Sequence, residues 1–277
     1  MSVKSIFALG AVTMAVLAAP VAEALPTLQL GILGATYSAG TETSVSTGPM
    51  FTLYAFLQPG DSSATLDTDY YISAALTPAV GPVPNTTLGS YSFAGATKNV
   101  TADMTYGTPP LDAVYGAVYG DLQTHSIFPT FFNEYGFKFN ANNKASAVDV
   151  QTNASLAGVS FSTTGVGDLY YASFDIDVTQ LSALYAMHFD LYNTDIRNCT
   201  GNQSCDTVVS RNDFAPFSHD AQSGSGSTSG GASGSGSTSG GASTSGQVPE
   251  PSSSALALLG LGLVVGSFAM RRKAKGV

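Results

Sequence analysis

The stretch Leu169–Val178 reads LYYASFDIDV, and it decides the fold class of this chain. In its second half, FDIDV, apolar residues alternate with Asp175 and Asp177. A β-strand would place the apolar side chains on one face and the two carboxylates on the other. This period of two predicts a half-buried strand, with one face in the core and one face in water.

A second stretch, Ala183–Tyr192 (ALYAMHFDLY), repeats the alternation. Its phase places His188 and Asp190 on the face opposite Met187 and Phe189. By the same argument we expect His188 and Asp190 to face water.

Five more segments are short, apolar or alternating, and bounded by Gly, Pro, Asn or Asp. They are Thr27–Tyr37, Met50–Leu57, Tyr70–Leu76, Val114–Tyr119 and Phe131–Phe139. No window shows a long apolar period of 3.6 residues. Strands at this spacing predict an all-β fold, namely an antiparallel β-sandwich that is either jelly-roll-like or immunoglobulin-like.

The two ends of the chain differ from this middle. Residues 1–24 have a basic Lys4, an apolar run and a small-residue site at Ala22 and Ala24, which predicts a signal peptide that signal peptidase removes. Residues 222–247 are mostly Gly, Ser, Thr and Ala, and the unit GSGSTSGGAS occurs twice, which predicts a flexible linker. The folded domain is therefore expected at 25–221 and a separate C-terminal segment at 248–277.

Charge is distributed unevenly. The chain has 19 acidic and 10 basic residues and a formal net charge of −9. Only Glu23 and Glu250 of the acidic residues lie outside 25–221, whereas half of the basic residues do. A domain this acidic argues against nucleic acid as a partner.

Two pairs of carboxylates could offer oxygen ligands to Ca²⁺: Asp67 with Asp69, and Asp175 with Asp177. No EF-hand loop surrounds either pair, so the preferred interpretation is a solvated strand face or turn. We expect no metal and no other cofactor.

Motifs for catalysis are absent from the sequence. His125, His188 and His219 are isolated, without a His-x-His or H-E-x-x-H pattern. No G-x-S-x-G elbow and no phosphate-binding glycine loop occurs. These observations predict a protein that is not an enzyme.

The two cysteines, Cys199 and Cys205, lie in the polar stretch NCTGNQSC. An exported chain meets an oxidising compartment, so we expect a disulfide that clips this loop. A redox-active pair is the alternative, but C-x-x-C spacing is absent.

The tail combines three features. Pro249, Glu250 and Pro251 precede an apolar run at 255–270, and a basic cluster then follows, formed by Arg271, Arg272, Lys273 and Lys275. The run predicts a single membrane-spanning helix whose basic end stays in the cytoplasm. The prolines fix an exposed, extended backbone of the form that a protease binds, although a plain anchor is the alternative.

This arrangement resembles the PEP-CTERM sorting domain in the order and spacing of all three parts. The matching residues are Val248–Pro251, the apolar Leu256–Phe268 and Arg271–Lys273. The resemblance implies processing near Pro249–Pro251 by an exosortase in the inner membrane of a Gram-negative bacterium. It also implies transfer to the cell surface or release, often alongside exopolysaccharide, with Pro249, Glu250 and Pro251 as a substrate site.

The middle of the chain resembles the choice-of-anchor N proteins. The resemblance rests on ALPTLQLGI, FTLYAFL, YYISAAL, HFDLYNT and FAPFSHDAQS. It implies domain boundaries and no particular activity.

Three functional hypotheses follow. The first is an exported, non-enzymatic surface or matrix protein. The second is a carbohydrate-binding module in which exposed Tyr70, Tyr71 and Tyr170 stack on sugar rings. The third is a secreted hydrolase in which His188 and Asp190 converge with a nucleophile in a pocket.

Overall fold

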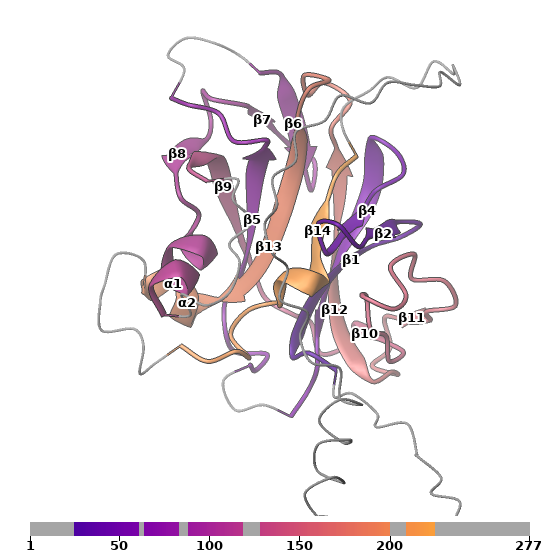
Figure 1. Cartoon of the computed structure of the whole chain (residues 1–277). Coiled ribbons are helices and arrows are strands. Elements are labelled where there is room, and N and C mark those ends of the chain that lie inside the picture. The colour runs from indigo at the N-terminus through magenta and orange to yellow at the C-terminus, as the bar shows by residue number, and fades with distance from the viewer. Residues whose placement is uncertain (1–24, 61–63, 83–87, 119–127, 200–208, 225–277) are drawn as a thin grey trace, which may run out of the picture. The chain divides into compact units, whose positions relative to one another are not determined.

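The computed structural model describes residues 25–60, 64–82, 88–118, 128–199 and 209–224, and these form two β-sheets with few helices (Figure 1). The all-β class predicted from the alternating segments is therefore confirmed. The predicted signal peptide, the linker beyond residue 224 and the C-terminal segment lie outside the described residues. Within the described ranges, no helix is long and apolar enough to cross a membrane.

The first sheet, sheet A, contains the strand that opened the sequence argument. Its strands are β1 (Leu28–Ile32), β4 (Met50–Leu57), β12 (Leu169–Asp177), β10 (Lys144–Ala145), β11 (Phe161–Ser162), β6 (Ser90–Phe93) and β7 (Ala96–Asn99). They follow the order β1-β4-β12-β10-β11, with β6 also paired to β12, and β7 paired to β6. Every pair in this sheet is antiparallel.

The second sheet, sheet B, has the order β2-β3-β14-β13-β5-β9-β8. Its strands are β2 (Thr36–Ser38), β3 (Thr43–Val45), β14 (Asp220–Gln222), β13 (Ala186–Asn193), β5 (Tyr70–Thr77), β9 (Thr130–Phe137) and β8 (Thr105–Gly107). The prediction of purely antiparallel pairing is wrong at one place, because β14 pairs with β3 in parallel. The chain between β3 and β14 is long enough for the crossover connection that a parallel pair requires.

The two sheets share one hydrophobic core. Leu30 and Leu53 from sheet A and Ile72 and Phe189 from sheet B are all fully buried in it. The predicted strand phase of β12 is confirmed, because Ile176 is buried in this core while Asp175 is exposed on the other face.

One predicted strand is a helix. Val114–Tyr119 was expected to be extended, but α1 (Pro110–Val118) covers it as far as the structure describes it. Pro110 suits the first position of a helix, where no backbone donor is needed. Leu111 and Val114 are one turn apart and both buried, so the helix packs an apolar face that the sequence pattern had assigned to a strand.

Sheet B has a second covered face. Tyr192 of β13 packs there with Leu111 and Val114 of α1, with Ile196 of α2 (Thr194–Asn198), and with Phe214. Figure 1 shows α1 and α2 side by side at one end of this sheet. His188 and Asp190 share this face with Tyr192 and are buried, so the prediction that they face water is wrong.

Strand β14 extends the folded domain beyond residue 221, the predicted boundary. After the 3₁₀ turn η2 (Phe217–His219), Gln222 pairs with His188, and Ser223 donates its backbone N–H to the Met187 carbonyl at 2.8 Å. Gly224 donates to the Ser46 hydroxyl at 2.9 Å. Residues 222–224 of the predicted linker range are thus hydrogen-bonded to the domain.

Candidate functional site

The covered face of sheet B holds a cluster of ionisable side chains. His188 and Asp190 are two residues apart on β13 and therefore share this face. Asp220 begins the neighbouring strand β14, where the pairing of Phe189 with Ala221 places it beside Asp190. His188 is 2% exposed, and Asp190 and Asp220 are each 1% exposed.

These three side chains converge on each other. His188 Nε2 lies 3.2 Å from Asp190 Oδ1 and 3.5 Å from Asp220 Oδ2. One ligand atom from each residue falls within 4.8 Å of the other two. Among the described residues, this is the group of His, Cys, Asp or Glu side chains whose geometry suits a metal ion.

Asp112 of α1 adds a third buried carboxyl group within electrostatic reach. Burial raises the pKa of Asp112 to about 9, Asp190 adds to the increase, and His188 opposes it. Burial alone would lower the pKa of His188, but Asp190 and Asp220 outweigh that effect and raise it to about 9. In the protein alone, near neutral pH, Asp112 is therefore protonated and His188 is an imidazolium.

Ser73 of β5 completes the polar row. It is the direct cross-strand partner of Asp190, so the two side chains point to the same face. Ser73 is fully buried, and its Oγ has no hydrogen-bond partner among the described residues. On its other side Ser73 pairs with Glu134, whose carboxylate accepts a 2.8 Å hydrogen bond from Tyr192.

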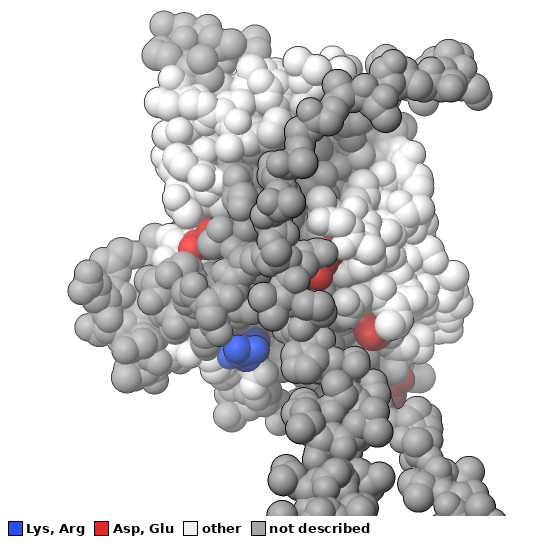
Figure 2. All heavy atoms as spheres, in the orientation of Figure 1, with Lys and Arg blue, Asp and Glu red and all other residues white. Residues whose placement is uncertain are grey.

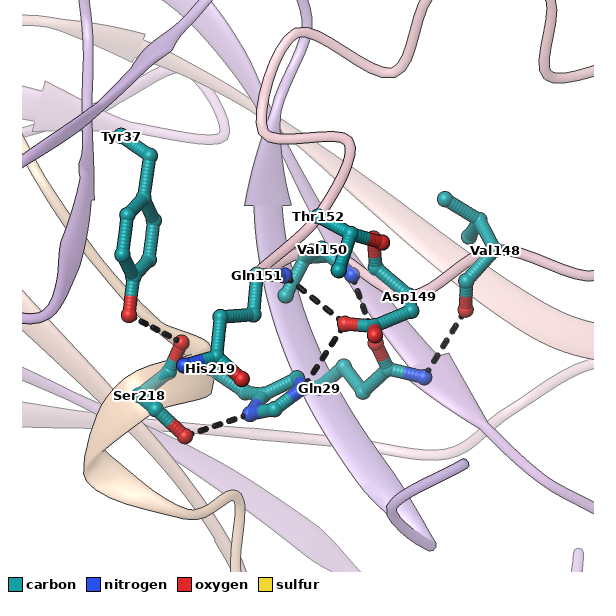
Figure 3. Close-up of polar contacts among 9 residues, drawn as sticks. All are labelled: Gln29, Tyr37, Val148, Asp149, Val150, Gln151, Thr152, Ser218 and His219. Atoms are coloured by element: carbon teal, nitrogen blue, oxygen red, sulfur yellow. Dashed lines mark hydrogen bonds and ion pairs between the residues drawn. The ribbon is translucent and has the colours of Figure 1, made fainter. Parts of the chain in front are cut away.

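The second histidine of the described chain, His219, lies in a different environment (Figure 3). Its Nε2 is 3.0 Å from Asp149 Oδ1, and its Nδ1 is 2.8 Å from the Ser218 hydroxyl. The Asp149 side chain is 28% exposed. The contacts join η2 to the loop that follows β10.

Gln29 of β1 forms two hydrogen bonds to the backbone of the same loop. Its amide Nε2 donates to the Val148 carbonyl at 3.1 Å, and its Oε1 accepts from the Val150 backbone N–H at 3.0 Å (Figure 3). Gln29 is 1% exposed, so both bonds are shielded from water. The hydrogen-bonded chain Ser218–His219–Asp149 therefore lies in a structural junction. Its serine contacts Nδ1 and its aspartate contacts Nε2, which is the reverse of the order in a serine-protease triad.

The carboxylate pairs suggested for Ca²⁺ are not brought together. Asp69 forms an ion pair with Lys138 at 3.5 Å, and Lys138 also donates to the Asp67 carbonyl. Asp175 accepts from the Thr52 hydroxyl at 3.2 Å, and Asp177 accepts from the Thr179 backbone N–H at 2.8 Å. Asp67 and Asp69 lie just before β5 of sheet B, whereas Asp175 and Asp177 lie on β12 of sheet A.

The tyrosines suggested for sugar stacking are engaged within the protein. Tyr70 is fully buried in the core, so the expectation that it is exposed is wrong. The Tyr71 ring has Arg197 4.5 Å from its centroid and stacks on Tyr192. The Tyr170 ring has the Lys144 ammonium 3.4 Å from its centroid.

Several other predicted site residues lie outside the described ranges. They are Ala22, Ala24, His125, Cys205, Pro249, Glu250, Pro251, Arg271, Arg272, Lys273 and Lys275. Cys199 is described and is buried in the cluster around Tyr192. The Cys199–Cys205 disulfide stays a prediction.

Charged side chains are sparse on the face that Figure 2 shows, where those of the described residues lie singly among uncharged ones.

Comparison with known proteins assigns the tail. Residues 247–273 match the PEP-CTERM protein-sorting motif. The chain carries an exosortase sorting signal. The match indicates an extracellular protein that is exported through a membrane-anchored intermediate and processed by exosortase. No curated protein and no solved structure matches the chain, and the choice-of-anchor N resemblance of the middle stays a prediction.

Sequence reasoning missed Asp220 and Ser73. The signal for half of the cluster was present, because His188-x-Asp190 on a strand places both side chains on one face. Asp220 stands 30 positions further along, and nothing local indicates that its strand pairs with β13.

Proposed function

We propose that this chain is an exported, non-enzymatic surface or extracellular-matrix protein of a Gram-negative bacterium. Its acidic β-sandwich domain is presented outside the cell, and its tail is a sorting signal that exosortase recognises and removes. The observation that carries the proposal is the match of residues 247–273 to the sorting motif. Association with exopolysaccharide is part of the proposal, because such proteins are often exported alongside it.

The test is the intact mass of the mature protein from its native host, measured separately in membranes and in the medium. We expect a species that begins near Leu25, ends near Pro249–Pro251 and is found in the medium or at the cell surface. A chain in which Pro249, Glu250 and Pro251 are all replaced by Ala should keep Arg271–Lys275 and stay in the membrane. The variant Thr244→Ala, a few residues before the motif, should be processed like the wild type.

A wild-type chain that keeps its basic cluster and remains in the membrane would overturn the sorting proposal. The tail would then be a permanent anchor, and the domain would act at the membrane.

The two alternatives receive less support. Tyr70 cannot stack on a sugar because it is buried in the core, and Tyr71 and Tyr170 each have a cationic side chain against the ring. A hydrolase would need substrate to reach His188 and Asp190, and both are closed to water. Retention of the mature chain on washed exopolysaccharide, or its absence there, tests the matrix association directly.

A further inference from the structure

We propose that His188, Asp190 and Asp220 bind one divalent first-row transition-metal ion, and that this ion joins strands β13 and β14 within sheet B. The inference is independent of the sorting proposal, because it concerns the folded domain alone. Three observations carry it: the spacing of the ligand atoms, a buried hydroxyl group beside them and the chemistry of the donor set.

The spacing of the ligand atoms fits a metal centre. Two atoms bound to a tetrahedral ion at about 2.0–2.1 Å are about 3.3–3.4 Å apart. His188 Nε2 lies 3.2 Å and 3.5 Å from the nearest oxygens of Asp190 and Asp220. The two distances from His188 thus match those of a shared ion, and all three ligand atoms lie within 4.8 Å of one another.

Ser73 provides an independent indication of a ligand. Its hydroxyl is fully buried, has no hydrogen-bond partner among the described residues, and lies on the same sheet face directly opposite Asp190. Burying a hydroxyl without a partner costs about 1–3 kcal/mol. An ion with a bound water at this position would give the hydroxyl a partner and remove that cost.

The donor set selects the class of ion. One imidazole nitrogen with two carboxylates suits Zn²⁺ and its first-row neighbours, whereas Ca²⁺ takes six to eight oxygen ligands. A divalent ion balances both carboxylate charges, and an imidazolium balances one. Because the ligands are 1–2% exposed, the ion would be structural and not open to a substrate.

The position of Asp220 gives the ion a mechanical role. Asp220 begins β14, the last strand of the described residues. Two ligands lie on β13 and one on β14, so the ion would reinforce the pairing of these two strands, in which His188 faces Gln222 and Phe189 faces Ala221. Metal binding of this kind adds its free energy to folding.

The experiment measures metal in the full mature chain, purified without chelators or a histidine tag. We expect about one equivalent of metal by elemental mass spectrometry. After removal of the metal, Zn²⁺ alone should bind at one equivalent by calorimetry and raise the melting temperature. Co²⁺ should give the visible absorption of a tetrahedral nitrogen–oxygen site, and hydrogen exchange should slow in residues 220–224.

Two variants separate this site from adventitious binding. Asp220→Asn keeps the shape of a ligand but removes its charge, and should weaken Zn²⁺ binding by at least about 100-fold, beyond the loss seen for outer-shell partners. Asp149→Asn removes the carboxylate of the other histidine–aspartate pair and should leave Zn²⁺ binding unchanged. Circular dichroism should show both variants folded.

Either of two results would overturn the proposal. The first is a folded wild-type chain that takes up no stoichiometric Zn²⁺ or Co²⁺ and shows no thermal shift. The second is equal loss of binding in Asp149→Asn and Asp220→Asn, which would place the metal elsewhere. If Asp220→Asn does not fold, the Co²⁺ spectrum and the exchange data on the wild type decide the question.

Discussion

His188 lies 3.2 Å from an oxygen of Asp190, and His219 lies 3.0 Å from an oxygen of Asp149, yet water reaches only one of the two pairs. The Asp190 side chain is fully buried, while that of Asp149 is 28% exposed. In the first pair, the free-energy cost of removing the charges from water must be offset by well-placed ion-pair and hydrogen-bond partners. In the second, solvent screens the Asp149 carboxylate, and the contact contributes little. The same two residue types therefore have different energetic consequences.

The largest expected effect is at the buried histidine. His188→Ala should lower the free energy of unfolding by about 3–5 kcal/mol, because it removes the imidazolium that balances the buried carboxylates of Asp190 and Asp220. Urea denaturation in the presence of a chelator measures the contribution of the ion pairs alone. His219→Ala is the matched control, and a loss of similar size there would remove the distinction between the two regions.

The next effect concerns the loop that His219 contacts. Gln29→Ala removes the partners of the Val148 carbonyl and the Val150 N–H, and should cost about 1–3 kcal/mol for unsatisfied buried groups. We expect faster hydrogen exchange at Val150 in the same variant.

Gln58 offers a control for this prediction. Its Oε1 is buried and has no hydrogen-bond partner among the described residues, so Gln58→Ala should change stability much less than Gln29→Ala. Equal losses would show that packing, and not the hydrogen bonds of Gln29, holds the loop.

A smaller effect is expected at the partly exposed pair of His219 and Asp149. Asp149→Asn should cost about 0–1 kcal/mol, since the amide oxygen can still accept from the Gln151 N–H and the lost charge is screened. The difference from the wild type should shrink as salt is added. A loss above 2 kcal/mol that is insensitive to salt would mean that this pair behaves like the buried one.

The strand alternation was predictable, and its environment was not. The FDIDV pattern predicted correctly which residues of β12 enter the core, because strand phase is a local property. The same logic placed His188 and Asp190 together but in water, whereas both are buried, on the face where α1 and Phe214 pack against Tyr192. Such a cover comes from distant parts of the chain, so no local period can indicate it.

The helix and the cluster were missed for related reasons. Residues 114–119 are rich in Val and Tyr, which favour strands, and tertiary packing of Leu111 and Val114 against Tyr192 outweighs that preference. Asp220 joins the cluster only through strand pairing across 30 residues. The sorting motif was found because its parts are contiguous and need no fold to be recognised.

The smallest expected change in stability is also the most discriminating. Without metal, Ser73→Ala should leave the free energy of unfolding unchanged or slightly raised, because it removes a buried hydroxyl that has no partner among the described residues. With Zn²⁺ present, the same variant should be less stable than the wild type and bind the ion about 10-fold more weakly, as expected for an outer-shell partner. Urea denaturation of both proteins, with and without Zn²⁺, measures this reversal. If Ser73→Ala is equally destabilising in both conditions, the hydroxyl interacts with protein groups and not with a metal-bound water. The residues around His188 would then form a buried ion-pair network without a metal ion.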